Sequence, residues 1–236
     1  MNKKLHLSTH QSRILFRLMI LMSLNIVVYN SYSQQKSNRP LKKTTMAADT
    51  TTKKKPLSPQ ERAFAVGLLT ETEAGVSSAI EGLNQIQLTY KPAADKWSIE
   101  ECVKHIAISE KNLWEMVNGV LKQPANPEKR TEIKSTDEAF INAVKDRSHK
   151  SKTVESFEPI KSGYKSLAEA ITSFKENRAK LVAFVQSTPE DLRDHVAVLP
   201  MGTYDAYQLI LLIGAHSDRH TQQIEEVKAN VNFPKR

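Results

Sequence analysis

The strongest constraint on the fold is a helix-start pattern that occurs four times. In a capping box, a Ser side chain accepts from the amide three residues on, and a Glu at that position reaches back to the Ser amide. The chain offers this pattern at Ser58–Glu61, Ser98–Glu101, Ser135–Glu138 and Ser166–Glu169, each time before a run of apolar residues. One copy arises easily by chance, but four in this arrangement predict a protein built from helices.

The apolar residues after these starts recur at helical spacing and predict where the helices run. Expected helices cover residues 59–83, 99–121, 137–146 and 167–186, with a last long helix from Thr203 or Asp205 to about residue 229. Pro200 and Gly202 are expected in the loop before that last helix. Strand signals are few, so the sequence predicts an all-α fold, a four-helix bundle with an extra short helix.

Two finer features of the first half are also predicted from the pattern. The stretch from Leu88 to Trp97 is expected to be a loop that leads into the second helix. The core-facing residues of the first helix are expected to be Phe64, Leu68, Ala74, Ala79 and Leu83.

The N-terminal part of the chain is typical of an export signal. Basic residues precede a short apolar run from Leu18 to Tyr29, and the small residues Ser31 and Ser33 follow it. We therefore expect a signal peptide at 1–33, a Lys- and Thr-rich flexible linker at 34–56 and one domain at 57–236, with export to the periplasm or the medium. An uncleaved membrane anchor is the alternative, and the mature chain is expected to have no integral membrane span.

The basic charge of the chain belongs to this leader. Residues 1–56 carry eleven of the 34 Lys and Arg residues and one of the 26 Asp and Glu residues, which leaves residues 57–236 close to neutral. A nucleic-acid-binding protein should carry its basic patch on the folded domain, so nucleic acid is not an expected partner. The single cysteine, Cys102, is expected to be a small buried residue.

Three histidines fall on the apolar faces of two expected helices. His216 and His220 are four residues apart, so they stack on one face, where they continue the stripe that includes Leu209. His105 lies on the apolar face of the second helix. Neutral imidazoles are good ligands for Zn²⁺, Ni²⁺ or Fe²⁺, and three protein ligands with an open position are typical of catalytic zinc.

Other interpretations of the histidines remain open. A histidine on an apolar face is often a core residue that hydrogen-bonds to a carbonyl or a hydroxyl group. No Glu follows His216 directly, which excludes the H-E-x-x-H pattern of zinc proteases. His149 lies in a polar loop and is expected to be solvated, whereas His195 is a weaker candidate to approach the mouth of the site.

Two stretches resemble the DinB-like superfamily: KWSIEECVKHIAISE, Lys96 to Glu110, and AHSDRHTQQI, Ala215 to Ile224. Members share a W-S-x-x-E-x-x-x-H-x-x-x-x-E helix start and a late H-x-x-x-H helix. The resemblance covers about residues 57–236. It implies an up-down-down-up four-helix bundle, often dimeric, with a divalent metal on three histidines, which by position are His105, His216 and His220. Trp97 and Ser98 match the helix start, and Glu110 matches an acid that we expect to be salt-bridged or solvated.

The resemblance leaves the function open between two classes. Members of known activity include thiol-dependent S-transferases and isomerases, which implies a metal-dependent enzyme acting on a small molecule. A hydrolase that uses metal-activated water suits an exported protein better than a thiol-dependent S-transferase, because low-molecular-weight thiols are mainly cytosolic. The alternative is a non-catalytic binding or stress-associated bundle in which the metal is structural.

Overall fold

A computed structural model describes residues 55–149 and 152–235. The expected signal peptide and almost all of the expected linker lie outside these residues. Within the described part, no helix combines the length and the apolar character needed to cross a membrane.

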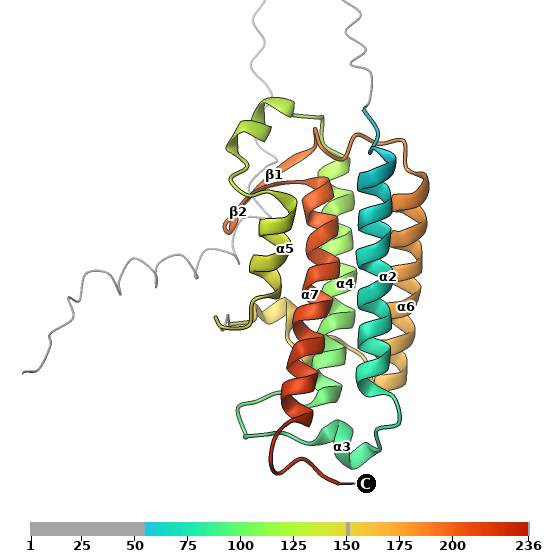
Figure 1. Cartoon of the computed structure of the whole chain (residues 1–236), viewed down its shortest axis with the longest axis vertical. Coiled ribbons are helices and arrows are strands. Elements are labelled where there is room, and N and C mark those ends of the chain that lie inside the picture. Colours follow the sequence, from blue (N-terminus) through green and yellow to red (C-terminus); the bar gives the residue numbers. More distant parts are fainter. Residues whose placement is uncertain (1–54, 150–151, 236) are drawn as a thin grey trace, which may run out of the picture. The chain divides into compact units, whose positions relative to one another are not determined.

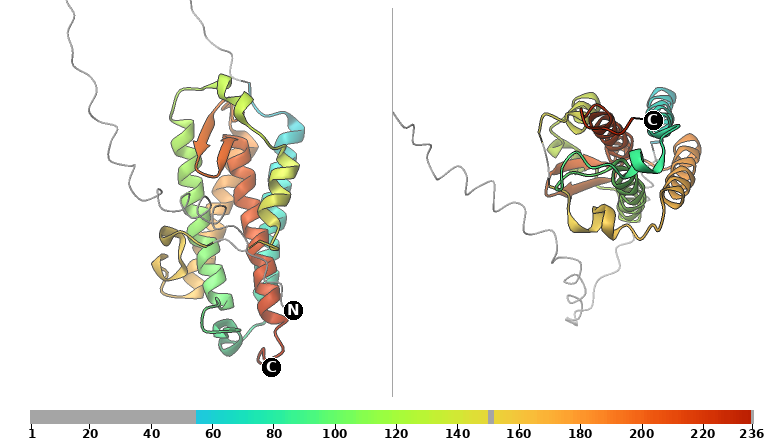
Figure 2. Two further views of the ribbon diagram at one scale, coloured as in Figure 1. Left: turned by 90° about the vertical axis from the view of Figure 1, so that its left-hand side faces the viewer. Right: turned by 90° about the horizontal axis from the view of Figure 1, so that it is seen from below.

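Four long helices form the bundle shown in Figure 1: α2 (Pro59–Ile80), α4 (Ile99–Leu121), α6 (Leu167–Ser187) and α7 (Ala206–Lys228). Each packs on two neighbours, in the ring order α2, α6, α4, α7. The extra short helix α5 (Asp137–Lys145) packs on α7, outside that ring, as the view from below in Figure 2 shows. The bundle predicted from the sequence is therefore present.

Contacts at one end of the bundle fix the directions of the helices. Arg193 pairs with Glu61 in the first turn of α2 and with Asp205, the N-cap of α7, so these two helices start at the same end. After α4 and α6, the Asn126 amide donates to the Asp194 carbonyl at 2.8 Å, so these two helices finish at that end. The order is the up-down-down-up arrangement that the resemblance implied.

A long crossover joins the parallel helices α4 and α6. It contains the 3₁₀ turn η1 (Pro127–Glu132), helix α5, and two further 3₁₀ turns, η2 (Glu155–Phe157) and η3 (Pro159–Lys161). The last two pack on α4. This crossover brings backbone groups to the side of α4 that carries His105.

The predicted helix starts are correct in three of four places. Ser58 and Ser98 form complete capping boxes with Glu61 and Glu101. Ser166 accepts from the Glu169 amide, but the Glu169 carboxylate accepts from the Lys165 amide instead of closing the box. The predicted box at Ser135 is wrong, because Thr136 is the N-cap of α5 and accepts from the Ala139 amide.

The all-α prediction is wrong at one place, a two-stranded antiparallel hairpin. Strands β1 (Val196–Leu199) and β2 (Gly202–Asp205) pair where a loop was expected. Gly202 has φ 143°, a backbone conformation that favours glycine and permits the tight turn after Pro200. Four-residue strands are too short for their alternation to stand out in a sequence.

The region between α2 and α4 also differs from the prediction. Helix α2 ends at Ile80, where the extended Glu81 and Gly82, with φ 68°, form a turn closed by a bond from the Leu83 amide to the Ile80 carbonyl. A further helix, α3 (Gln85–Thr89), follows before the loop.

The predicted inner face of α2 is correct only in part: Ala79 is buried and Leu68 packs against the core, but two other predicted residues face solvent. Phe64 is 51 % exposed, and Ala74 is exposed too. Apolar residues occur on several sides of this helix, so periodicity alone does not select the buried side. The buried residues are Ala65, Leu69, Thr72, Val76 and Ala79.

A layer of buried polar side chains divides the apolar core into two clusters along the bundle. Every long helix contributes apolar residues to both clusters and one polar residue between them. These polar residues are Thr72, Glu110, Arg178 and Ser217. The histidine pair of α7 adjoins this layer, since His216 precedes Ser217.

Candidate metal centre

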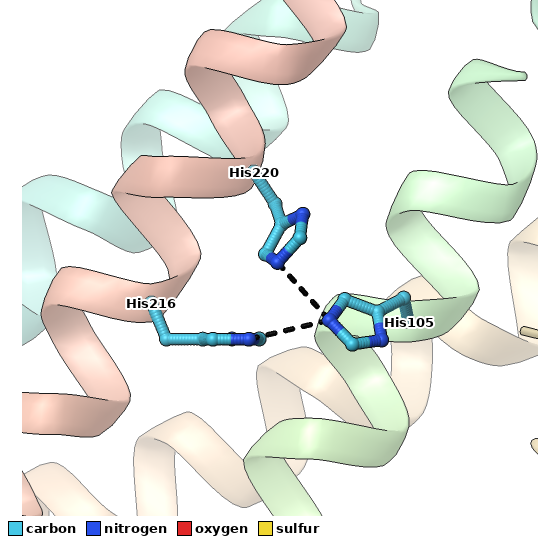
Figure 3. A group of neighbouring side chains, drawn as sticks. All are labelled: His105, His216 and His220. Atoms are coloured by element: carbon cyan, nitrogen blue, oxygen red, sulfur yellow. Dashed lines mark hydrogen bonds between the residues drawn. The ribbon is translucent and has the colours of Figure 1, made fainter. Parts of the chain in front are cut away.

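Histidines from two helices meet at one point inside the bundle. His105 comes from α4, and His216 and His220 come from successive turns of α7, as Figure 3 shows. The Nε2 atom of His105 lies 3.2 Å from Nε2 of His216 and 3.0 Å from Nε2 of His220. His105 and His220 are buried, and His216 is partly exposed. The structure thus brings together the three residues that the sequence selected.

The other ring nitrogens of two of these histidines have acceptors that fix their tautomers. Nδ1 of His105 lies 2.6 Å from the carbonyl oxygen of Phe157, which can only accept, so this Nδ1 carries a proton. Nδ1 of His220 lies 2.9 Å from Oε1 of Gln223. The same oxygen accepts from Arg147 Nη1 at 3.4 Å, which identifies it as the amide oxygen. Nδ1 of His220 is therefore also the donor.

With both Nδ1 atoms protonated, the facing Nε2 atoms of His105 and His220 have lone pairs and no proton between them. A doubly protonated ring would supply one, but burial lowers the pKa of His105 to about 4. Burial, together with the neighbouring histidines, also lowers the pKa of His216 and His220 well below the usual value. Two neutral acceptors 3.0 Å apart repel each other unless a cation lies between them.

The spacing of the nitrogens fits a metal ion. Metal–nitrogen bonds of about 2.0–2.1 Å at angles between about 90° and about 109° separate ligand nitrogens by about 2.9–3.4 Å. The two separations from His105, 3.0 and 3.2 Å, fall in this range. Acceptors on the Nδ1 side are the usual arrangement around metal-ligating histidines, since they orient each ring and raise its basicity.

Trp97 forms a wall of the histidine cluster. Its ring centroid lies 4.8 Å from that of His105 and 6.0 Å from that of His220, with the latter pair stacked. Trp97 directly precedes Ser98, the N-cap of α4, so the capped helix start fixes the indole about two turns before His105. A residue expected to be structural therefore also shapes the site.

A buried ion pair lies beside the histidines and holds four helices together. Arg178 of α6 donates through Nε and Nη2 to Glu110 of α4, each at 2.7 Å. It also donates to Thr72 of α2 and to Ser217 of α7, at 2.8 and 2.9 Å. Glu110 is thus salt-bridged, one of the two outcomes expected for it. Sequence reasoning missed Arg178, although a lone Arg on the apolar stripe between Phe174 and Leu181 was a visible signal.

The remaining candidates lie away from the cluster. His149 has a side chain that is 90 % exposed. The backbone of His195 bonds to the amide of Ala206, which begins α7 ten residues before His216, about 15 Å along the helix axis. His195 is therefore not at the site mouth. Cys102 is buried, and burial raises the pKa of its thiol to about 12, which makes it a poor nucleophile.

A pocket of about 490 Å³ opens beside the cluster. His220, Gln223 and Trp97 line it, together with Arg147 and Arg219. A cavity of this volume accommodates a small molecule.

Comparison with known proteins finds a family and a relative similar to this chain in sequence. The sequence model of the DinB superfamily matches residues 68–224. The uncharacterized protein YuaE of Bacillus subtilis (strain 168) is 25 % identical over 169 residues, which are 70 % of this chain and 98 % of YuaE.

A solved structure shares the fold. YfiT from Bacillus subtilis, described as "a probable metal-dependent hydrolase with an unusual four-helix bundle topology", superposes with a TM-score of 0.52 at 16 % identity. The alignment covers 75 % of this chain and 91 % of YfiT.

Proposed function

This chain belongs to the DinB superfamily, and from that membership and its histidine cluster we propose that it is a metal-dependent hydrolase of a small-molecule substrate. One divalent ion, Zn²⁺, Ni²⁺ or Fe²⁺, binds to His105, His216 and His220. The description of YfiT as "a probable metal-dependent hydrolase" supports the same class of activity.

A single observation supports metal binding most strongly. Nε2 of His105 and Nε2 of His220 face each other at 3.0 Å, and the acceptors at Phe157 and Gln223 hold the protons on the opposite nitrogens. A plain core histidine would direct its unprotonated nitrogen at a donor. Here the unprotonated nitrogen of His105 faces that of His220, an arrangement that a cation stabilises.

The donor set also favours an enzyme over a purely structural site. Three protein ligands leave a coordination position open, whereas structural zinc sites have four. A divalent ion held by these residues lowers the pKa of a water or a thiol that it binds and so supplies a nucleophile at neutral pH. The chain itself orients the rings through Phe157 and Gln223, covers the cluster with Trp97, and leaves a pocket beside His220 for the substrate.

Metal content is the first test. Full-length protein purified without a histidine tag should contain about one divalent ion per chain by mass spectrometry. The His216→Ala variant should contain none. Wild-type protein that takes up neither zinc, nickel nor iron on reloading would leave three core histidines and end the proposal.

Activity is tested next with panels of esters, amides and thiol-plus-electrophile pairs, using the metal-loaded protein and the His216→Ala variant. Turnover of an ester or amide above that of the variant supports the hydrolase. Turnover only with an added thiol assigns the S-transferase instead. A bound ion with no turnover, and a large fall in melting temperature on chelation, would indicate a structural metal.

We also propose that the protein is exported, because the N-terminal 33 residues have the pattern of a signal peptide. N-terminal sequencing of protein from the native host should find a mature chain that begins near Gln34. A mature chain that begins at Met1 would contradict export by cleavage.

A further inference from the structure

The pocket beside His220 is built by three segments that are distant in the sequence. The loop before α4 supplies Asp95, Lys96 and Trp97, and the crossover supplies Arg147, Lys152, Thr153 and Glu158. Helix α7 supplies Arg219, His220, Gln223, Glu226 and Val227. The histidine cluster therefore borders a cavity whose walls belong mostly to segments outside the four long helices.

Charged residues dominate these walls. Four basic residues line the pocket: Lys96, Arg147, Lys152 and Arg219. Three acidic residues also line it: Asp95, Glu158 and Glu226. The lining thus has one positive charge in excess, although the domain as a whole is close to neutral.

Two of the acidic residues are already held by basic neighbours. Asp95 lies 2.6 Å from Lys96, and Glu226 takes the Nε and Nη2 atoms of Arg147 at 2.6 and 2.7 Å. Arg219 and Lys152 are the basic residues that remain, against one remaining acidic residue, Glu158, so the excess positive charge lies on this pair.

The contacts of Arg219 leave its charge largely in place. Its Nη atoms donate to the backbone carbonyls of Val144, Asp146 and His149, around the end of α5. Carbonyl dipoles stabilise a cation but do not neutralise it. Arg147 reaches the same turn of α7, since its Nη1 donates to the backbone carbonyl of Arg219 at 3.4 Å. Both residues line the pocket.

A metal ion on three neutral histidines would keep its full charge of two and add to the positive potential of the pocket. From this combination we propose that the pocket binds an oxyanion of the substrate, a carboxylate or a phosphate, against Arg219 and Lys152. This inference rests on the proposed function, because it names the substrate class of the same site. The anion holds the substrate beside the histidine cluster and selects charged over uncharged substrates.

Anion binding is measured without turnover. The full-length Trp114→Phe variant keeps Trp97, which lines the pocket, as its only tryptophan, and its fluorescence is followed during titration with sodium phosphate or sodium acetate at constant ionic strength. We expect a saturable change with at least one of the two ions, in metal-loaded and in metal-free protein. The ion that binds more tightly distinguishes phosphate from carboxylate.

Variants locate the anion. Arg219→Gln and Lys152→Gln should each weaken binding about tenfold, the size expected when a charged hydrogen-bond donor is lost. Lys152 is exposed, so its replacement does not put folding at risk. Arg130→Gln is the matched control, because Arg130 pairs with Asp194 at the other end of the bundle. Affinity unchanged by Lys152→Gln and Arg219→Gln, or binding that needs the metal and ignores both variants, would overturn the inference.

A pair of chromogenic esters separates this inference from the proposed function. The wild-type metal-loaded protein should prefer 4-nitrophenyl hydrogen succinate over 4-nitrophenyl acetate in kcat/KM, and Lys152→Gln should reduce that preference about tenfold. Hydrolysis of both esters without preference overturns the anion site and keeps the hydrolase. Variant-sensitive phosphate or acetate binding with no hydrolysis supports the anion site and contradicts the hydrolase.

Discussion

The proton on Nδ1 of His105 determines which nitrogen of its ring is free to bind a metal ion. Because the Phe157 carbonyl accepts a hydrogen bond from this N–H group, Nε2 carries the lone pair, which is aimed at the two rings of α7. His105→Ala should therefore reduce metal affinity as much as His220→Ala, although the two residues are more than a hundred positions apart in the sequence. Metal content after gel filtration measures the effect, and His149→Ala, at an exposed loop position, is the control that should keep its metal. Full metal content in His105→Ala would refute the pairing of the two helices at the site.

Gln223 is a positioning residue for His220. Its amide oxygen accepts a hydrogen bond from Nδ1 of His220 and so aims Nε2 at the cluster. Gln223→Leu should lower metal affinity about 10- to 100-fold, the usual cost of removing such a partner. Gln223→Glu keeps an acceptor at the same distance and should restore most of the affinity. Competition with a chromogenic chelator gives both dissociation constants, and equal losses in the two variants would mean that the oxygen plays no part.

At the scale of helices, the polar layer ties the bundle together beside the histidines. Arg178 has a fully buried side chain and bonds to groups on the other three long helices. Arg178→Met would leave the Glu110 carboxylate buried without its partner, so we expect a loss of about 3–5 kcal/mol in the free energy of unfolding.

The double variant Glu110→Leu with Arg178→Met tests the same explanation. It removes both charges together and should be clearly more stable than Arg178→Met alone, because no unpaired charge remains. Urea unfolding of the two proteins gives the comparison. A double variant no more stable than the single one would mean that packing, rather than an unpaired charge, sets the cost.

Helix starts were predictable because their signals are local. The Ser58 and Ser98 side chains bond to amides three residues away, and their partners appear in the same short stretch of sequence. The hairpin is different, because β1 also depends on a distant side chain. Asn126 accepts from the Val196 amide at 2.8 Å and donates to the Val196 carbonyl at 3.0 Å. Contacts between residues seventy positions apart leave no periodic pattern that a sequence could show.

In the molecule as a whole, the sequence predicts the side chains of the histidine cluster but not the backbone group that orients His105. The spacing of His216 and His220 places both on one face, and the position of His105 on a second apolar face made the third member visible. The acceptor for His105 is a backbone carbonyl, which any residue at position 157 would provide. The position of this carbonyl beside α4 follows from the path of the long crossover, so no residue type in the sequence predicts it.

Enclosing three histidines in one folded molecule also makes the stability of the metal-free protein depend on pH. Burial disfavours the charged form of each of the three histidines: it lowers the pKa of His105 to about 4 and those of His216 and His220 well below the usual value. Histidines of the unfolded chain titrate near a pKa of about 6.5. Between these values the unfolded chain binds more protons, so the free energy of unfolding rises with pH over this window and levels off above about pH 7. The His105 shift alone corresponds to about 3 kcal/mol of unfolding free energy lost on going from pH 7 to pH 4.

Urea unfolding of chelated protein in half-unit steps from pH 7.5 to 4.5 measures the slope of the free energy of unfolding against pH. Carboxylates with lowered pKa values, such as Glu61, act in the same direction but mainly below this window. The His105→Gln variant isolates the histidine contribution, because its curve should be flatter than that of the wild type by the His105 share. Parallel curves for the two proteins would show that His105 does not remain neutral in the folded state.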